Sequence, residues 1–257
     1  MTGLTLQDRA VIVTGAGNGI GRATALLCAA HGAPVAVVDR DGPSAKRVAA
    51  ELDASGAAAI AIEADVSDET AVDNVVRRAT AELGPLYGIV NNAGLIVTKP
   101  LAETTVAEWE KVMAVNARGA FLGCRAAVRE FLSTDTAGAI VNIGSISATV
   151  GLAGQPAYCA SKGAVLQLSR QIAVDYSRHG IRCNVVSPGS VTTAVLDDYL
   201  SGQDKPDAAR EDIIAAHPIG RLAQPAEIAA AVYFALSPEA SFLTGANIAA
   251  DGGYTAQ

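Results

Sequence analysis

Tyr158 and Lys162 place a phenol and an ammonium group four residues apart. Residues at that spacing share one face of a helix, and the apolar pattern of residues 157–178 predicts a helix there. A free tyrosine has a pKa of about 10, so acid–base work near neutral pH needs that pKa lowered by roughly 2–3 units. A nearby ammonium and a bound positive charge together favour the phenolate. The pair therefore predicts a proton-transfer site, although Tyr-x-x-x-Lys also occurs by chance in purely structural helices.

Two further polar residues could complete such a site. Ser145 follows a predicted strand over 139–143 and precedes Tyr158 by 13 residues, so its hydroxyl could hold and polarise a substrate carbonyl. Asn116 lies between the predicted helices 106–115 and 117–132, where a local break would expose its carbonyl or amide to water. A helix cap is the alternative role for Asn116.

A glycine-rich string follows the first predicted strand, residues 10–13, and leads into a predicted helix over 19–30. Gly15, Gly19 and Gly21 would let backbone N–H groups approach a pyrophosphate at the positive end of that helix. Strand, string and helix in this order predict a dinucleotide site, whereas glycines alone also mark ordinary turns. The spacing is Gly-x-x-x-Gly-x-Gly, which differs from the Gly-x-Gly-x-x-Gly of the commoner nucleotide fold.

Asp39 closes the second predicted strand, residues 34–38. A carboxylate at this place accepts hydrogen bonds from the adenine ribose hydroxyls and repels a 2′-phosphate. The next residue, Arg40, could pair with that phosphate instead. The residue that directly follows the strand is the acid, so we predict NAD rather than NADP. The alternative is that Asp39 is a turn acid before Asp41-Gly42.

Strand ends elsewhere supply the remaining cofactor positions. Asp65, after the predicted strand 58–62, could accept from the adenine amino group beside the Val66 N–H, or could help cap the next helix with Ser67 and Asp68. Near the nicotinamide, Thr193 could bond the carboxamide with help from the Val191 backbone. The predicted cofactor residues are Gly15, Asn18, Gly19, Ile20, Gly21, Asp39, Arg40, Asp65, Val66, Asn92, Ala93, Gly94, Tyr158, Lys162, Pro188, Gly189, Val191 and Thr193.

The elements that must position these residues alternate along the chain. Predicted strands cover 10–13, 34–38, 58–62, 87–90, 139–143, 181–186 and 247–249, and predicted helices cover 19–30, 43–55, 69–83, 106–115, 117–132, 157–178 and 225–236. Such alternation implies right-handed crossovers and an α/β, Rossmann-type, doubly wound parallel sheet in a single domain over 1–257. A polar, irregular stretch over 197–212 predicts a flap near 190–217 that covers the substrate, or else a plain surface loop.

Charge and composition exclude several classes of partner. The net charge of −7 disfavours nucleic acid and anionic membrane surfaces. Met1–Gly19 lacks the pattern of a signal peptide, and the apolar run Ile228–Leu236 is too short to span a bilayer, so we expect a cytoplasmic protein. The four cysteines form no Cys-x-x-Cys pair and are expected to be reduced and mostly buried. We predict no metal site.

The ordered set Thr14-Gly15-x-x-x-Gly19-x-Gly21, Asn91-Asn92-Ala93-Gly94, Asn116, Ser145, Tyr158-x-x-x-Lys162 and Pro188-Gly189 resembles the short-chain dehydrogenases/reductases over essentially the whole chain. The resemblance implies a seven-stranded parallel sheet and a homotetramer. It also implies that Tyr158 is the acid/base, that Ser145 orients the substrate oxygen, and that Lys162 binds the nicotinamide ribose and tunes Tyr158. Asn116 would position a water between Lys162 and solvent. NAD-preferring members of the family carry an acid where Asp39 stands.

The resemblance extends in weaker form to the tail and to the helix faces. The last seven residues, from Asp251, resemble those of bacterial secondary-alcohol and polyol dehydrogenases, some of which carry a structural magnesium nearby. Gly123–Val128 and Ala164–Ile172 are implied to pack between subunits, with packing inside one chain as the alternative.

The expected substrate pocket is mixed and largely apolar. Its predicted residues are Ser147, Val150, Gln155, Ser190, Val195, Leu196 and Tyr199. Such a pocket suits a neutral secondary alcohol or ketone, cyclic or polyol-like in form. A 3-oxoacyl-carrier-protein reductase and a sugar 1-dehydrogenase are rivals within the family. A non-catalytic NAD-binding regulatory protein is a rival from another class, because a fold does not fix an activity.

Overall fold

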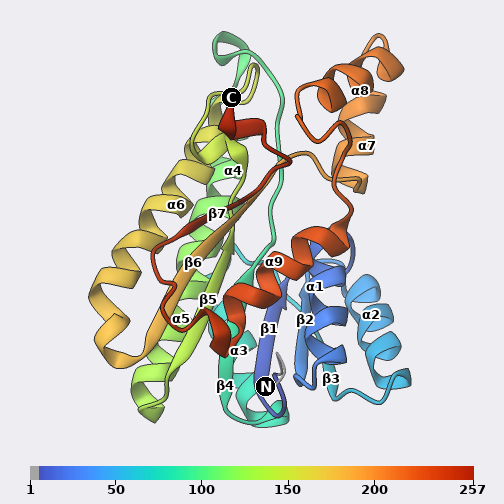
Figure 1. Cartoon of the computed structure of the whole chain (residues 1–257). Coiled ribbons are helices and arrows are strands. Elements are labelled where there is room, and N and C mark those ends of the chain that lie inside the picture. Colours follow the sequence, from blue (N-terminus) through green and yellow to red (C-terminus); the bar gives the residue numbers. More distant parts are fainter. Residues whose placement is uncertain (1–5) are drawn as a thin grey trace.

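A computed structural model describes residues 6–257, so the first five residues of the predicted domain lie outside the described residues. The strands are β1 (Ala10–Thr14), β2 (Val35–Asp39), β3 (Ala59–Glu63), β4 (Leu86–Asn91), β5 (Gly138–Ile143), β6 (Ile181–Pro188) and β7 (Asn247–Ala250). They form one sheet in the order β3-β2-β1-β4-β5-β6-β7, and all neighbours pair in parallel (Figure 1). The predicted doubly wound parallel sheet is confirmed.

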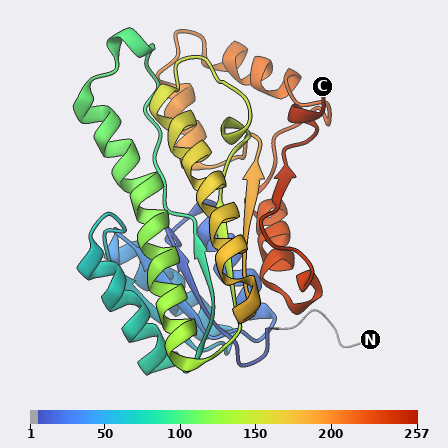
Figure 2. The same ribbon diagram turned by 90° about the vertical axis from the view of Figure 1, so that its left-hand side faces the viewer.

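Helices cover both faces of this sheet (Figure 2). One face carries α1 (Gly19–Ala30), α2 (Gly42–Ala54) and α9 (Pro225–Leu236), and the other carries α3 (Glu69–Leu83), α5 (Gly119–Thr134) and α6 (Pro156–Tyr176). Side chains of β1 alternate between the two cores, with Val11 and Val13 in the first and Ile12 in the second. Strands buried on both faces must be apolar throughout, which explains their continuous aliphatic runs.

A π-helical segment joins two helices at the predicted break near Asn116. Here α4 (Val106–Val112) continues through η2 (Met113–Arg118) into α5 without leaving the helical conformation. Such π segments insert one extra residue into a helical turn and are frequent at functional sites. The break is therefore a wide turn of one continuous helix, and Asn116 lies buried within it.

The prediction of an irregular stretch over 197–212 is wrong, because most of these residues are helical. The structure has α7 (Ala194–Ser201) and α8 (Pro206–Ala215) there. Pro206 begins α8, where a missing N–H costs nothing, and Gly202 follows the end of α7. These two residues are helix boundaries rather than signs of disorder. Leu200 is the one buried residue of α7, and α8 has none, so the pair stands outside the two cores (Figure 1).

The predicted subunit faces differ in how far one chain already buries them. Most of Gly123–Val128 is buried, and a Cβ on Gly123 would lie 2.1 Å from the Asn91 Oδ1, so packing inside one chain accounts for this stretch. The stretch Ala164–Ile172 alternates buried and exposed residues. Cys28, Cys124 and Cys183 are buried free thiols, and Cys159 is half-buried.

The described residues give two limited negative findings. No helix within residues 6–257 has the length and apolar character needed to cross a membrane. Within the same residues, no cluster of three or more His, Cys, Asp or Glu side chains is arranged to hold a metal ion.

Candidate active site

The four predicted catalytic residues converge beyond the ends of β4 and β5. The Lys162 Nζ lies 5.6 Å from the centre of the Tyr158 ring, and the Ser145 hydroxyl is near enough to Tyr158 to act on its pKa. A Cβ built on Gly94 would lie 3.4 Å from the Asn116 Oδ1 and 3.7 Å from the Lys162 Nζ. Residues from η2, β5, α6 and the loop after β4 therefore meet around one point at the carboxyl edge of the sheet, where α/β folds bind ligands.

Burial sets the acid–base character of the Tyr158–Lys162 pair. Burial raises the pKa of Tyr158, and the hydrogen bond from Ser145 opposes that rise. Burial lowers the pKa of Lys162 to about 8. The expected lowering of the Tyr158 pKa is thus not supplied by the surrounding protein, because loss of solvation outweighs the Ser145 hydrogen bond. The phenol is protonated near neutral pH unless a further positive charge lies beside it.

Lys162 is held by the strand next to the site. Its Nζ donates to the Ile143 carbonyl at 2.8 Å, at the end of β5. The side chain is only 4% exposed, and no carboxylate within residues 6–257 forms an ion pair with it. An ammonium held by one carbonyl in a buried site keeps its charge at a cost, which explains the lowered pKa.

Ser145 is fixed by the turn that follows β5. It caps the short 3₁₀ helix η3 (Ile146–Ala148), and its Oγ accepts from the Ser147 N–H at 3.1 Å. The hydroxyls of Ser145 and Ser147 lie 3.0 Å apart. The hydroxyl is therefore held in one place beside Tyr158, while its own hydrogen can be donated to an oxygen in the site.

The Asn116 side chain is fully engaged by protein groups. Its Oδ1 accepts from the Leu95 N–H at 2.9 Å, and its Nδ2 donates to the Leu95 carbonyl at 2.9 Å and to the Ser161 Oγ at 3.1 Å. The side-chain amide is therefore not exposed to water, contrary to one of the two sequence expectations. Only its backbone carbonyl remains for a water relay.

The glycine string forms a cradle that larger residues would fill. Gly15 and Gly19 have φ of +61° and +53°, in the left-handed region that favours glycine. A Cβ on Gly21 would lie 2.2 Å from the Gly15 carbonyl oxygen and 2.5 Å from the Asn92 Nδ2. A Cβ on Gly19 would lie 3.4 Å from the Thr193 Cγ2, so the loop faces the segment after β6. A close-approach loop at a helix N-terminus fits a pyrophosphate.

The Asp39 carboxylate points at this loop rather than only capping its own turn. Its Oδ2 accepts from the Gly17 N–H at 2.9 Å, and its Oδ1 accepts from the Asp41 N–H at 3.0 Å. The Arg47 Nη2 of α2 donates to the Gly17 carbonyl at 2.7 Å. Sequence reasoning missed Arg47, because nothing in the local pattern of α2 indicates its contact with a loop 30 residues away. Arg40 is exposed.

The two acids after β3 have separate roles. Asp65 accepts from the Ser67 N–H at 2.9 Å and from the Ser67 hydroxyl at 2.7 Å, and these bonds lower its pKa. Asp68, not Asp65, caps α3 through the Ala71 N–H at 3.1 Å. Thr14, which sequence reasoning gave no role, accepts from the N–H groups of Asn92 and Ala93 at 3.0 and 3.1 Å. The ends of β1 and β4 are thereby joined.

The segment after β6 runs from Gly189 to Thr193 and leads into α7. The Gly189 N–H donates to the Ala250 carbonyl at 3.2 Å, and Val191 forms an isolated parallel bridge with Ala223. Thr193 caps α7. Sequence reasoning missed His217, which accepts a hydrogen bond from the Ser190 N–H at 3.0 Å.

The predicted pocket residues come from four places in the chain. Ser147 and Val150 lie in and after η3, Gln155 begins α6, Ser190 follows β6, and Val195, Leu196 and Tyr199 lie on α7. The Gln155 Oε1 is buried and has no hydrogen-bond partner in the described part of the chain.

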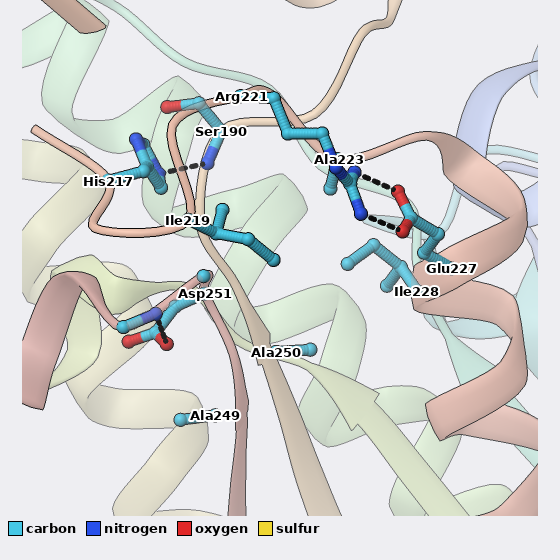
Figure 3. A pocket seen from close by; sticks show the side chains of 13 residues that line it. Ser190, His217, Ile219, Arg221, Ala223, Glu227, Ile228, Ala249, Ala250 and Asp251 are labelled. Carbon is cyan, nitrogen blue, oxygen red and sulfur yellow. Dashed lines mark hydrogen bonds and ion pairs between the residues drawn. The ribbon is translucent and has the colours of Figure 1, made fainter. Parts of the chain in front are cut away.

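A cavity of about 280 Å³ opens beside the segment after β6 (Figure 3). It shares Ser190 with the predicted pocket but is lined by none of the four predicted catalytic residues. His217, Arg221, Glu227 and Asp251 line it, and the Arg221 and Glu227 side chains pair with each other. The cavity is therefore distinct from the predicted substrate pocket.

Comparisons with known proteins agree over nearly the whole chain. The family model described as enoyl-(acyl carrier protein) reductase matches residues 15–255. The chain is 41% identical over 251 residues to 2-(S)-hydroxypropyl-CoM dehydrogenase 3 of Xanthobacter autotrophicus, covering 98% of each protein. It is 42% identical over 255 residues to cis-4-hydroxycyclohexanecarboxylate dehydrogenase of Sinomonas cyclohexanicum, covering 99% of each.

A solved structure of a short-chain type dehydrogenase/reductase from Mycobacterium marinum superposes with a TM-score of 0.91 at 31% identity, covering 98% of each chain. The fold, the chain length and the sequence of this protein thus all match those of the proteins just named.

Proposed function

Because the chain belongs to the short-chain dehydrogenase/reductase family, we propose that it transfers a hydride between NAD(H) and a secondary alcohol or ketone. The observation that carries the proposal is the convergence of Tyr158, Ser145 and Lys162 on one point beside the glycine cradle. All of these groups lie at the carboxyl edge of one sheet, so a single domain would bind the dinucleotide and carry the chemistry.

In the oxidative direction, Tyr158 as phenolate accepts the proton of the substrate hydroxyl. The Ser145 hydroxyl, held by η3, donates a hydrogen bond to the same oxygen and fixes its distance from the phenol. The Lys162 ammonium, buried beside the ring, stabilises the phenolate and would bind the nicotinamide ribose. When bound, the nicotinamide supplies the acceptor for the hydride that leaves the carbinol carbon. In reduction, the Tyr158 phenol donates its proton to the carbonyl oxygen.

The proposed substrate is a neutral secondary alcohol or ketone, with a cyclic carbon skeleton favoured. The names of the relatives describe a hydroxypropyl group in one case and a hydroxycyclohexane ring in the other, both secondary alcohols. The second also carries a carboxylate, so the neutral character of the proposed substrate rests on the largely apolar predicted pocket. Val150, Val195 and Leu196 would supply apolar contacts, and the unpartnered Gln155 Oε1 would accept from a second hydroxyl of a polyol-like substrate.

Assembly and location are also proposed. We propose a cytoplasmic homotetramer, because α5 and α9 leave large apolar side chains exposed within one chain. Phe121 and Leu132 on α5 are 43% and 42% exposed, and Phe234 on α9 is 40% exposed. Exposed large apolar side chains of this kind are typical of surfaces that become covered by another subunit.

Cofactor preference provides one test of the site. Asp39→Ser removes the carboxylate that would repel a 2′-phosphate and also the acceptor of the Gly17 N–H. We expect the wild-type protein to prefer NAD over NADP by about 10²-fold or more in kcat/KM, and the variant to bring the two cofactors within about tenfold, a loss of more than ~1 kcal/mol of discrimination.

Asp53→Ser on the exposed far end of α2 removes the same charge and is the matched control, with the preference retained. A wild-type enzyme that prefers NADP, or an Asp39→Ser variant with an unchanged ratio, would contradict the NAD assignment.

The proposed activity itself is tested by incubating the full-length protein with NAD and a panel of secondary alcohols, including cyclopentanol, cyclohexanols and sugars, and recording NADH absorbance. We expect turnover on neutral secondary alcohols. Turnover confined to 3-oxoacyl thioesters or to sugars would identify a rival within the family. Tight NADH binding with no turnover on any compound would favour a non-catalytic NAD-binding protein.

A further inference from the structure

His217 is a buried histidine that the proposed chemistry does not use. It follows α8, at the point where the flap returns to the sheet, and its side chain is only 3% exposed. The ring packs against the Tyr254 ring, with centroids 5.2 Å apart. A buried polar ring is normally hydrogen-bonded, and its partners indicate its role.

The two partners of the ring define its tautomer. The Nε2 lies 3.0 Å from the Ser190 N–H, and the Nδ1 lies 2.7 Å from the Ile213 carbonyl. A backbone N–H only donates and a carbonyl only accepts. The ring must therefore carry its hydrogen on Nδ1 and present a lone pair on Nε2, which is the neutral Nδ1–H tautomer.

This hydrogen-bonded bridge joins the far end of the flap to the segment after β6. Ile213 belongs to α8, and Ser190 directly follows Pro188-Gly189. Two backbone hydrogen bonds strengthen the junction, from Ala223 N–H to the Ser190 carbonyl at 3.0 Å and from Thr192 N–H to the Ala223 carbonyl at 2.9 Å. Figure 3 shows the His217 ring directed at Ser190 from the segment that follows α8.

Glycines on two sides make room for the ring and its segment. A Cβ on Gly189 would lie 2.6 Å from the His217 Nε2, so the close approach requires glycine there. A Cβ on Gly252 would lie 2.6 Å from the Ile219 Cγ2, so the C-terminal turn presses on the segment from the other side. His217 is thus held between the segment after β6 and the tail.

We propose that His217 is a positioning residue for the nicotinamide half of the cofactor. As the neutral Nδ1–H tautomer it accepts from Ser190 N–H and fixes the backbone of residues 188–193, whose Val191 and Thr193 would hold the carboxamide. It also couples that segment to α8 of the flap. This inference rests on the proposed function, because it assumes that the segment after β6 lies against the nicotinamide.

Two substitutions separate the hydrogen bonds of the ring. In His217→Gln the amide can reach the position of Nε2 and supply an oxygen to the Ser190 N–H. In His217→Asn the amide reaches only the position of Nδ1, so the Ile213 carbonyl keeps its donor while Ser190 N–H loses its acceptor. Because an unpaired buried N–H is costly, we expect His217→Asn to raise the Kd for NADH about five- to fiftyfold, and His217→Gln to stay within about threefold.

ADP-ribose, which lacks the nicotinamide, supplies the readout that a merely structural role would not move. Titrations followed by the fluorescence of Trp109 should give the same Kd for ADP-ribose in the wild type and in both variants, within about twofold. A His217→Asn variant that binds NADH as the wild type does, or that loses NADH and ADP-ribose equally, would overturn the proposal. A wild-type protein that does not bind NADH would instead defeat the proposed function.

If either variant fails to fold, the wild-type tautomer keeps the proposal testable. With ¹⁵N-histidine incorporated into the full chain, we expect the His217 ring in the NADH complex to be protonated at Nδ1 and unprotonated at Nε2. A hydrogen on Nε2 would remove the acceptor for Ser190 and overturn the proposal.

Discussion

The Tyr158→Phe variant should lose nearly all turnover while still binding NADH. The substitution removes one hydroxyl and leaves the ring, its place on α6 and the buried Lys162 unchanged. Positioned proton transfer contributes about 10²–10⁴-fold to an enzymatic rate, so we expect kcat to fall by that factor while the Kd for NADH stays within about twofold. Steady-state NADH absorbance measures kcat, and fluorescence titration measures the Kd for NADH.

Tyr176→Phe is the matched control, because Tyr176 ends the same helix and is remote from Ser145. It should retain wild-type kcat. The wild-type rate of alcohol oxidation should rise with pH, because burial raises the pKa of Tyr158 and oxidation needs the phenolate. Ketone reduction needs the protonated phenol and should fall as pH rises. Turnover within tenfold of wild type in Tyr158→Phe would remove Tyr158 from its proposed role.

The parts of the fold that sequence predicted well are those set by local pattern. The strands β1, β2 and β3 were predicted to within one or two residues, because each is a short aliphatic run buried on both faces. The glycine string could be placed for the same reason, since its strand and helix flank it directly. The parallel pairing of the strands then followed from the alternation of strands and helices.

The helical conformation of residues 206–215 was not predicted, because α8 lacks an apolar stripe facing the core. Helix α8 buries no residue, so the periodicity that marks a core-facing helix is absent from it. The remaining sequence signals for this helix are Pro206 in its first turn and the acidic Asp207 beside it, both typical of a helix start. Gly202 and Pro206 are also typical of loops, and here they mark the boundaries between two helices.

Contacts between distant segments could not be predicted from one sequence. In the π segment, the Asn116 side chain bonds to Leu95 and Ser161, residues 21 and 45 positions away. Likewise, the bond from Ser190 N–H to His217 spans 27 positions. Such pairs are set by tertiary packing, and no local pattern in either partner distinguishes them from ordinary surface residues.

The burial of Lys162 implies a conflict between stability and function. Unfolded, this lysine has its ordinary pKa of 10.5, and folding lowers the pKa to about 8. Below about pH 8 the ammonium is charged in both states, so folding bears the full cost of burying the charge. Between about pH 8 and 10.5 the folded form is neutral while the unfolded form is still charged, so the cost shrinks as pH rises. A shift of this size corresponds to roughly 3 kcal/mol.

The Lys162→Met variant should therefore be inactive and yet more stable than the wild type. Methionine keeps the length of the side chain, removes the charge and leaves the Ile143 carbonyl without its Nζ partner, which costs about 1–2 kcal/mol. We expect a net gain of about 1–2 kcal/mol in unfolding free energy at pH 7, and a loss of roughly 10²-fold or more in kcat/KM.

Urea unfolding at pH 7 and at pH 10 measures the stability of both proteins, with Lys111→Met on the exposed surface of α4 as the control for a Lys-to-Met exchange. The difference between Lys162→Met and the wild type should decrease from pH 7 to pH 10, because the wild type sheds its buried charge over that range. A variant less stable than the wild type at pH 7, or a gain that grows with pH, would mean that the ammonium is stabilised by the fold. The charge beside Tyr158 would then contribute to stability, and no conflict between stability and function would exist at this site.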